Sequence, residues 1–146
     1  METQSIGFIG GGRITRIFLT AFKNVSISFQ HISVLDTNEI ILNDLKSKFE
    51  EINVTSTDFT MVANADVVFL AVHPPVVMET IAKIKDVIQH DTILVSLAPK
   101  ITIQQMSEAV KAAQEVYAVS LKRAEADLAI ARRIPGYKVD KHDRVY

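Results

Sequence analysis

Three consecutive glycines near the start of the chain restrict its fold more than any other feature. Residues 5–9 form a short apolar run, the glycines at 10–12 follow it, and residues 13–24 have the character of a helix. In a strand–turn–helix of this kind the first glycine permits a tight turn, and a later one lets the backbone approach a pyrophosphate. The N-terminus of the helix directs free N–H groups at that anion. We therefore predict that a dinucleotide contacts Gly10, Gly11, Gly12, Arg13 and Ile14.

The third position of this glycine fingerprint is occupied by Thr15, where Gly or Ala is expected. Because Thr is bulkier, we expect the strand and the helix to pack slightly less closely there. A glycine-rich turn that binds no ligand is the alternative interpretation. The surrounding strand and helix, and an acidic residue after the second strand, favour binding.

Apolar runs alternate with segments of helical spacing along the first hundred residues. The predicted strands cover residues 5–9, 31–36, 52–56, 66–72 and 92–98, and the predicted helices cover 13–24, 38–50 and 75–89. A short helical turn is expected within residues 57–65. This alternation predicts crossover units and a parallel sheet. The expected fold is α/β, a Rossmann-type doubly wound parallel sheet with strand order 3-2-1-4-5.

After residue 98 the pattern changes. Apolar and small residues recur at spacings of three and four from 103 to about 133, which predicts one long amphipathic helix or two helices in line. Pro135 and Gly136 end it, and residues 137–146 form a polar tail. We accordingly expect a dinucleotide-binding domain over residues 1–102. The second unit, residues 103–146, would be a long helix and tail through which copies of the chain associate as a homo-oligomer.

Asp36 closes the second predicted strand and is the candidate for recognising the adenine ribose. A carboxylate there accepts hydrogen bonds from the ribose hydroxyls and repels a 2′-phosphate. Thr37 follows it, and no Lys or Arg occurs before Lys46, so we expect NAD in preference to NADP. The alternative is that Asp36 only caps the next helix, which Thr37 or Asn38 would do equally well.

Composition excludes several other classes of protein. The 146 residues include no cysteine, so disulfides, thiolate catalysis and cysteine-based zinc sites are ruled out. The four histidines, at positions 31, 73, 90 and 142, have no metal-ligand spacing, and we predict no metal site. A net charge of −1 does not suggest nucleic-acid binding. We see no signal peptide and no membrane-spanning run, and we expect a cytoplasmic protein.

Three segments resemble the N-terminal half of pyrroline-5-carboxylate reductase. They are residues 6–15, with the glycine turn, residues 65–77, Ala-Asp-Val-Val-Phe-Leu-Ala-Val-His-Pro-Pro-Val-Val, and residues 91–101, Asp-Thr-Ile-Leu-Val-Ser-Leu-Ala-Pro-Lys-Ile. The resemblance extends over about residues 4–110. It implies an oxidoreductase that binds NAD(P)H and transfers hydride to the cyclic imine of pyrroline-5-carboxylate, which yields proline.

The resemblance also implies further cofactor contacts. The family has an Ala-Val-Lys-Pro loop against the cofactor, which corresponds here to Ala71, Val72, His73 and Pro74, with His in place of Lys. The alternative for His73 is an exposed loop residue without a role. Where the family tends to have Ala-Ala-Gly after the fifth strand, this chain has Ala98, Pro99 and Lys100. Lys100 would then be an unexpected cation near the nicotinamide end.

The resemblance stops at about residue 110. The family continues into a sixth strand with an Asn-Thr-Pro motif and then a helical domain that carries most of the substrate site, and nothing after residue 110 resembles either. We therefore assign no catalytic residue. One hypothesis is a shortened reductase, whose active site is completed by a partner chain or a dimer. A second is a non-catalytic nucleotide-binding module, whether a fragment, a cofactor sensor or an engineered fusion. A third, an oligomerisation unit with a vestigial Rossmann part, is disfavoured by the glycine turn with Asp36. Reductase ancestry without full catalysis in this chain is the interpretation we favour.

Overall fold

A computed structural model describes residues 4–110 and 117–120 of the chain. Within these residues the molecule has one parallel sheet in the order β3-β2-β1-β4-β5-β6. The strands are β1 (Ile6–Ile9), β2 (Ile32–Leu35), β3 (Asn53–Thr55), β4 (Val67–Leu70), β5 (Ile93–Ser96) and β6 (Tyr117–Ser120). The predicted order 3-2-1-4-5 is confirmed, and a sixth strand extends it beyond β5.

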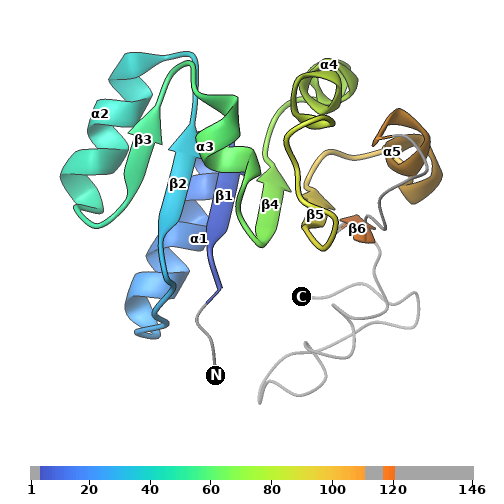
Figure 1. Cartoon of the computed structure of the whole chain (residues 1–146). Coiled ribbons are helices and arrows are strands. Elements are labelled where there is room, and N and C mark those ends of the chain that lie inside the picture. The colour runs from blue at the N-terminus through green and yellow to red at the C-terminus, as the bar shows by residue number, and fades with distance from the viewer. Residues whose placement is uncertain (1–3, 111–116, 121–146) are drawn as a thin grey trace, which may run out of the picture.

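Helices cover both faces of this sheet, as the near-continuous apolar strands require. They are α1 (Arg13–Asn24), α2 (Glu39–Lys48), α3 (Phe59–Ala63), α4 (Pro74–Ile84) and α5 (Ile103–Val110). In Figure 1 α1 lies behind the sheet and α3 lies in front of it. The short helix expected within residues 57–65 is therefore present as α3.

Two apolar clusters, one on each face, hold these layers together. Leu19 of α1 and Leu45 of α2 pack with Phe8 of β1 in one cluster. The other contains Val62 of α3, Ile81 of α4, and Met106 and Val110 of α5. Because side chains alternate along a strand, Phe8 and its neighbour Ile9 enter opposite clusters. Strand β1 is thereby anchored on both sides.

The C-terminal segment differs from the prediction of one long helix over residues 103–133. Helix α5 includes residues 103–110, but residues 117–120 form β6, which pairs in parallel with β5 from Ile93↔Tyr117 to Ser96↔Ser120. The prediction of a long helix is therefore wrong at residues 117–120, and residues 111–116 and 121–133 lie outside the described part of the chain. A run of Tyr, Ala, Val and Ser suits either a helix stripe or a strand. Pairing with the open edge of β5 favours the strand, because it satisfies the backbone groups of both segments.

Residues beyond the boundary predicted at 102 also belong to this sheet domain. Met106 and Val110 of α5 are buried in the cluster on the α3 side, at 1% and 4% exposure. The sixth strand that the resemblance implies is present as well, although it has no Asn-Thr-Pro motif. The described residues therefore contain no continuous C-terminal helix through which copies of the chain would associate. None of the helices described here is long and apolar enough to cross a membrane.

Candidate dinucleotide-binding site

The candidate site lies at the carboxyl ends of β1 and β4, the two central strands of the sheet. The strand order changes direction between them, since β1 is followed by β2 on one side and β4 by β5 on the other. Ligands of doubly wound sheets bind in the crevice at this switch point. The Ala71 N–H donates to the Ile9 carbonyl at 2.8 Å. The two predicted cofactor segments, residues 10–14 and 71–74, are thereby brought side by side.

Gly10 is the point where this close approach requires glycine. Its φ is +107°, a backbone conformation that residues with a side chain rarely adopt. A Cβ on Gly10 would lie 2.2 Å from the Ala71 carbonyl oxygen. The Gly10 N–H donates to Leu35 at 2.7 Å, which links the turn to β2 as well. The first glycine of the turn is therefore fixed by its neighbours, independently of any ligand.

Asp36 lies beside the turn, at the end of β2, and is half-buried. Its Oδ2 accepts a hydrogen bond from the Gly11 N–H at 2.8 Å, and its Oδ1 accepts one from the Asn38 N–H at 2.8 Å. The cap of α2 is Asn38, whose side chain accepts from the Ile40 N–H. The interpretation of Asp36 as a helix cap alone is therefore not supported. The exposed Thr37 follows it at the same edge.

Gly12 differs from Gly10 and Gly11 because it faces open space. Apart from its two neighbours in the chain, a Cβ built on it would meet no atom of the described residues within 4 Å. Gly12 is also the N-cap of α1, and no side chain caps that helix end. The N-terminus of a 12-residue helix thus opens toward the side of the turn where a pyrophosphate would lie. Ile14, in its first turn, is 46% exposed.

Two arginines occur in the first turns of α1, and only one is available to an anion. The Arg16 guanidinium is paired with the Asp44 carboxylate of α2 at 2.5 Å. The Arg13 side chain is exposed, and its guanidinium makes no ion pair or hydrogen bond within the described ranges. The structure therefore leaves Arg13 as the cation at the mouth of the turn.

The loop after β4 contributes the second side of the site. Ala71 and Val72 are half-buried, while His73 is exposed and is the N-cap of α4 without a side-chain hydrogen bond to that helix. Pro74 begins α4, one residue before the predicted start. His73 thus stands at the carboxyl edge with an imidazole that the helix end does not use.

Lys100 lies in the loop after β5, at the same edge of the sheet. It is exposed and has a φ of +67°, in the left-handed region that favours glycine. The resemblance implies a glycine at this position. Lys100 thus has a backbone conformation that glycine adopts more readily than lysine.

Sequence reasoning missed the roles of two residues near the turn. Gly7 lies within β1, and a Cβ there would be 2.3 Å from the Val62 carbonyl of α3, so this glycine lets α3 pack onto the strand. An isolated glycine in a strand is the signal that such a close approach leaves. Thr15 is fully buried, and its hydroxyl donates to the Gly10 carbonyl. Nothing in the sequence indicates that hydrogen bond.

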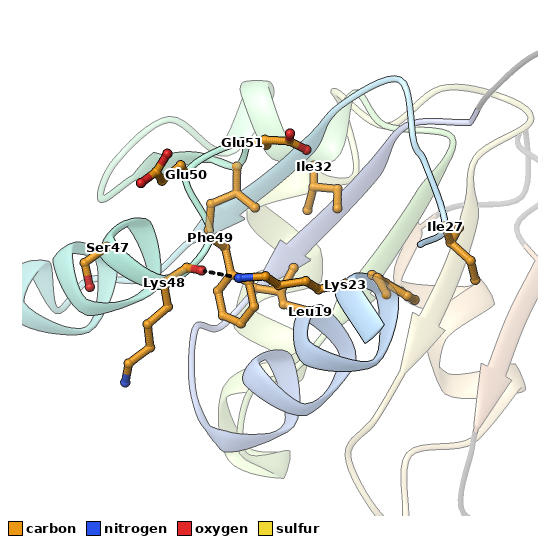
Figure 2. Close-up of a pocket in the computed structure, with 11 residues that line it drawn as sticks. Leu19, Lys23, Ile27, Ile32, Ser47, Lys48, Phe49, Glu50 and Glu51 are labelled. Carbon is orange, nitrogen blue, oxygen red and sulfur yellow. Dashed lines mark hydrogen bonds between the residues drawn. The ribbon is translucent and has the colours of Figure 1, made fainter. Parts of the chain in front are cut away.

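A hollow of about 540 Å³ lies at the opposite edge, near the start of β2 and of β3 (Figure 2). It separates the C-terminal ends of α1 and α2, and its apolar wall includes Leu19 and Ile32. Figure 2 shows Lys23 reaching across it to the Lys48 carbonyl, at 3.5 Å. The Lys23 ammonium also lies 5.9 Å from the centre of the Phe49 ring. This hollow is a seam between two helices and is remote from the glycine turn.

Perturbed carboxylates are found elsewhere in the domain. Hydrogen bonds from the Ser5 N–H and hydroxyl lower the pKa of Asp66, at the amino end of β4. A hydrogen bond from Lys48 is the largest cause that lowers the pKa of Asp44. Within the residues that the structure describes, no group of three His, Cys, Asp or Glu side chains could hold a metal ion.

The fold and this turn define a Rossmann-type domain of the kind that binds dinucleotides in oxidoreductases. The chain belongs to the family described as NADP oxidoreductase coenzyme F420-dependent, whose pattern matches residues 5–100.

Individual relatives agree with this assignment. The chain is 27% identical over 110 residues to a pyrroline-5-carboxylate reductase of Methanosarcina acetivorans, covering 75% of this chain and 40% of that protein. It is 29% identical over 119 residues to one of Corynebacterium melassecola, covering 79% and 43%. The structure of a pyrroline-5-carboxylate reductase from Coxiella burnetii matches with a TM-score of 0.70 and 27% identity, covering 79% of this chain and 43% of that one. The chain thus spans less than half the length of these relatives.

Proposed function

We propose that this chain binds a nicotinamide dinucleotide and forms the cofactor-binding part of an oxidoreductase of the pyrroline-5-carboxylate reductase type. The observation that carries the proposal is the surroundings of Gly12, where no described residue occupies the space around a Cβ and the N-terminus of α1 opens. Those features match the needs of a pyrophosphate, which requires close approach of backbone N–H groups. The residues present therefore fit the cofactor.

The remaining predicted contacts surround this pyrophosphate position. Gly10 and Gly11 shape the turn, and Arg13 offers a guanidinium without an ion-pair partner in the described residues. The loop of Ala71, Val72, His73 and Pro74 would border the cofactor on the β4 side. The dinucleotide, when bound, supplies a hydride for reduction, while the protein holds and orients it.

We further propose a preference for NAD over NADP, for which Asp36 is responsible. The hydrogen bonds from the Gly11 and Asn38 N–H groups hold both carboxylate oxygens in place. A carboxylate fixed in this way remains close to the position of the ribose hydroxyls and would repel a 2′-phosphate. The family description names NADP. A direct comparison of the two cofactors is therefore needed.

The substrate proposed is a cyclic imine such as pyrroline-5-carboxylate, by analogy with the relatives. Reduction would add a hydride to the imine carbon and a proton to its nitrogen. Since the chain spans 40–43% of the length of the curated relatives, the residues that hold this substrate would come from outside the segment described here. A second candidate is a module that binds the nucleotide without catalysis.

Calorimetric titration of the purified chain with NADH and with NADPH tests the proposal. We expect micromolar binding, with NADH the tighter ligand. A folded protein that binds neither would contradict the cofactor proposal. A steady-state assay with pyrroline-5-carboxylate then separates the two candidates, because turnover is expected only of a reductase. Light scattering on the same sample measures whether copies associate, which stays a prediction.

A further inference from the structure

We propose that Thr15 is a positioning residue that fixes the peptide between Gly10 and Gly11 and thereby sets the affinity for the dinucleotide. This inference rests on the proposed function and adds a residue to it. Thr15 occupies the third fingerprint position, where glycine or alanine is expected because strand and helix pack closely there. Its side chain is nonetheless fully buried.

The Thr15 hydroxyl is used in a single contact that no glycine or alanine would make. Its Oγ1 donates to the Gly10 carbonyl oxygen. No other donor to this carbonyl is found among residues 4–110 and 117–120. Because Gly10 is itself buried, removal of the hydroxyl would leave its carbonyl without that partner and away from water.

The other side of the same peptide is held from a different element. The Gly11 N–H donates to Asp36 Oδ2 at 2.8 Å. The carbonyl of this peptide is thus held from α1 by Thr15, and its N–H from the end of β2 by Asp36. Rotation about the flexible Gly10 backbone would break both hydrogen bonds together. The next peptide leads to Gly12, whose position decides how closely a pyrophosphate can approach.

This arrangement compensates for the departure from the glycine fingerprint. A glycine at the third position orders the turn by close packing, whereas Thr15 orders it by a buried hydrogen bond. A turn that is ordered before binding does not lose conformational freedom when the ligand arrives, and affinity is higher for that reason. The contribution should be equal for NADH and NADPH, because both have the same pyrophosphate.

The test compares Thr15→Val and Thr15→Ser by calorimetric titration with NADH and NADPH. Val keeps the volume but has no hydroxyl, so both affinities should fall about tenfold, as expected for one buried hydrogen bond. Ser keeps the hydroxyl and should bind like the unmodified chain. Thr15→Ala, which introduces no bulk, replaces Val if that variant does not fold. It should also bind more weakly.

Thr92→Val is the matched control. Thr92 is buried, at 1% exposure, and lies near the amino end of β5, where its hydroxyl donates to the Ala65 carbonyl at 3.1 Å and accepts from the Gln89 N–H at 3.2 Å. This variant loses a buried hydroxyl-to-carbonyl hydrogen bond like that of Thr15, and the bond from Gln89 as well, at the opposite edge of the sheet, and it should still keep its affinity. An equal loss of affinity in Thr92→Val and Thr15→Val would overturn the proposal, because general destabilisation would then explain both. Unchanged binding in Thr15→Val, or failure of Ser to restore binding, would overturn it too.

Amide hydrogen exchange supplies a measurement that needs no ligand. In Thr15→Val the Gly11 amide should exchange faster, while the amide of Val68 in β4 stays protected. If the unmodified chain binds neither dinucleotide, the proposed function fails and the affinity role of Thr15 fails with it. Unaltered exchange at Gly11 would separately refute the structural part of the inference.

Discussion

Gly10, Gly11 and Gly12 are chemically identical, but the structure gives each a different environment. A Cβ on Gly10 would overlap the Ala71 carbonyl, and one on Gly11 would press against α2 side chains at 3.1 Å. A Cβ on Gly12 would have no neighbour within 4 Å among residues 4–110 and 117–120, its adjacent residues in the chain aside. Gly10 is therefore required by the fold, a Cβ on Gly11 would need the α2 side chains to shift slightly, and Gly12 is free to serve a ligand.

Substitution of Gly12 should separate binding from stability. Gly12→Val is expected to abolish dinucleotide binding, because the side chain would fill the pyrophosphate position. It should change the free energy of unfolding by about 1 kcal/mol or less, the cost of a poorer N-cap. Gly10→Ala is the contrasting variant and should cost about 3 kcal/mol or more, since both φ and space oppose a Cβ. Urea denaturation and calorimetric titration measure the two effects. A Gly12→Val variant that titrates like the unmodified chain would refute the site.

Cofactor preference should depend on Asp36 and its neighbour. The double variant Asp36→Ala, Thr37→Arg removes the carboxylate and adds a guanidinium for a 2′-phosphate. The ratio of NADPH affinity to NADH affinity should rise at least tenfold, partly because NADH binding weakens as Gly11 loses its acceptor. Thr37→Arg alone is the control and should shift the ratio less. Unchanged relative affinities would exclude Asp36 as the selector.

Helix α1 ends with a turn in which Ser26 occupies a position where glycine is usual. Ser26 has a φ of +54°, and its N–H donates to the Lys23 carbonyl. The next N–H, of Ile27, donates to the Phe22 carbonyl at 3.1 Å. These two bonds are those of a Schellman motif, in which the residue with positive φ is usually Gly.

The end of α1 therefore predicts a stabilising change. Ser26→Gly should raise the free energy of unfolding by about 0.5 kcal/mol, because relief of the left-handed strain exceeds the entropy that glycine adds to the unfolded chain. Ser28→Gly, in the same loop but without a positive φ, should be neutral or destabilising. Thermal and urea unfolding of the two variants decide between these outcomes. Equal effects at both positions would mean that strain at Ser26 is unimportant.

Elements whose ends carry local signals were predicted closely. The bounds of α1 agree, and α4 begins at the Pro74–Pro75 pair where a first helical turn was expected. The segment after α5 has no such signal. Its Ala-rich spacing of three and four fits a helix, and only the open edge of β5 made residues 117–120 a strand. Tertiary pairing overrode a weak local preference there.

At the scale of the whole molecule, Asp66 links the amino ends of the two central strands, because it precedes β4 and bonds to Ser5, which precedes β1. Its Oδ2 accepts from the Ser5 N–H at 2.7 Å and from the Ser5 hydroxyl at 2.8 Å. These bonds lower its pKa in the folded state. The stabilisation is thus complete above the unfolded pKa of about 3.9 and is lost as the pH falls through the lower folded value.

Acid sensitivity should reveal this link. Asp66→Asn should reduce stability at neutral pH by about 1 kcal/mol or less, since the bonds are partly exposed to water. The variant should also lose less stability than the unmodified chain as the pH falls below about 4, because the folded-state pKa of Asp66 lies below the unfolded one. Asp91→Asn, at an exposed carboxylate without a hydrogen bond in the described residues, is the control. Parallel pH profiles for Asp66→Asn and the unmodified chain would refute the assignment.

The sequence alone determined the sheet of five strands, its order, and the edge of the sheet at which the glycine turn lies. Apolar periodicity, the three glycines and the acid at the end of β2 are local signals, and each depends only on near neighbours in the chain. The contacts that join distant segments were decided only by tertiary structure. They include the hydrogen bond from Gly11 to Asp36, the approach of Gly10 to Ala71 and the pairing of β6 with β5. Sequence spacing does not fix where a side chain or a strand edge finds its partner, because that depends on how the layers pack.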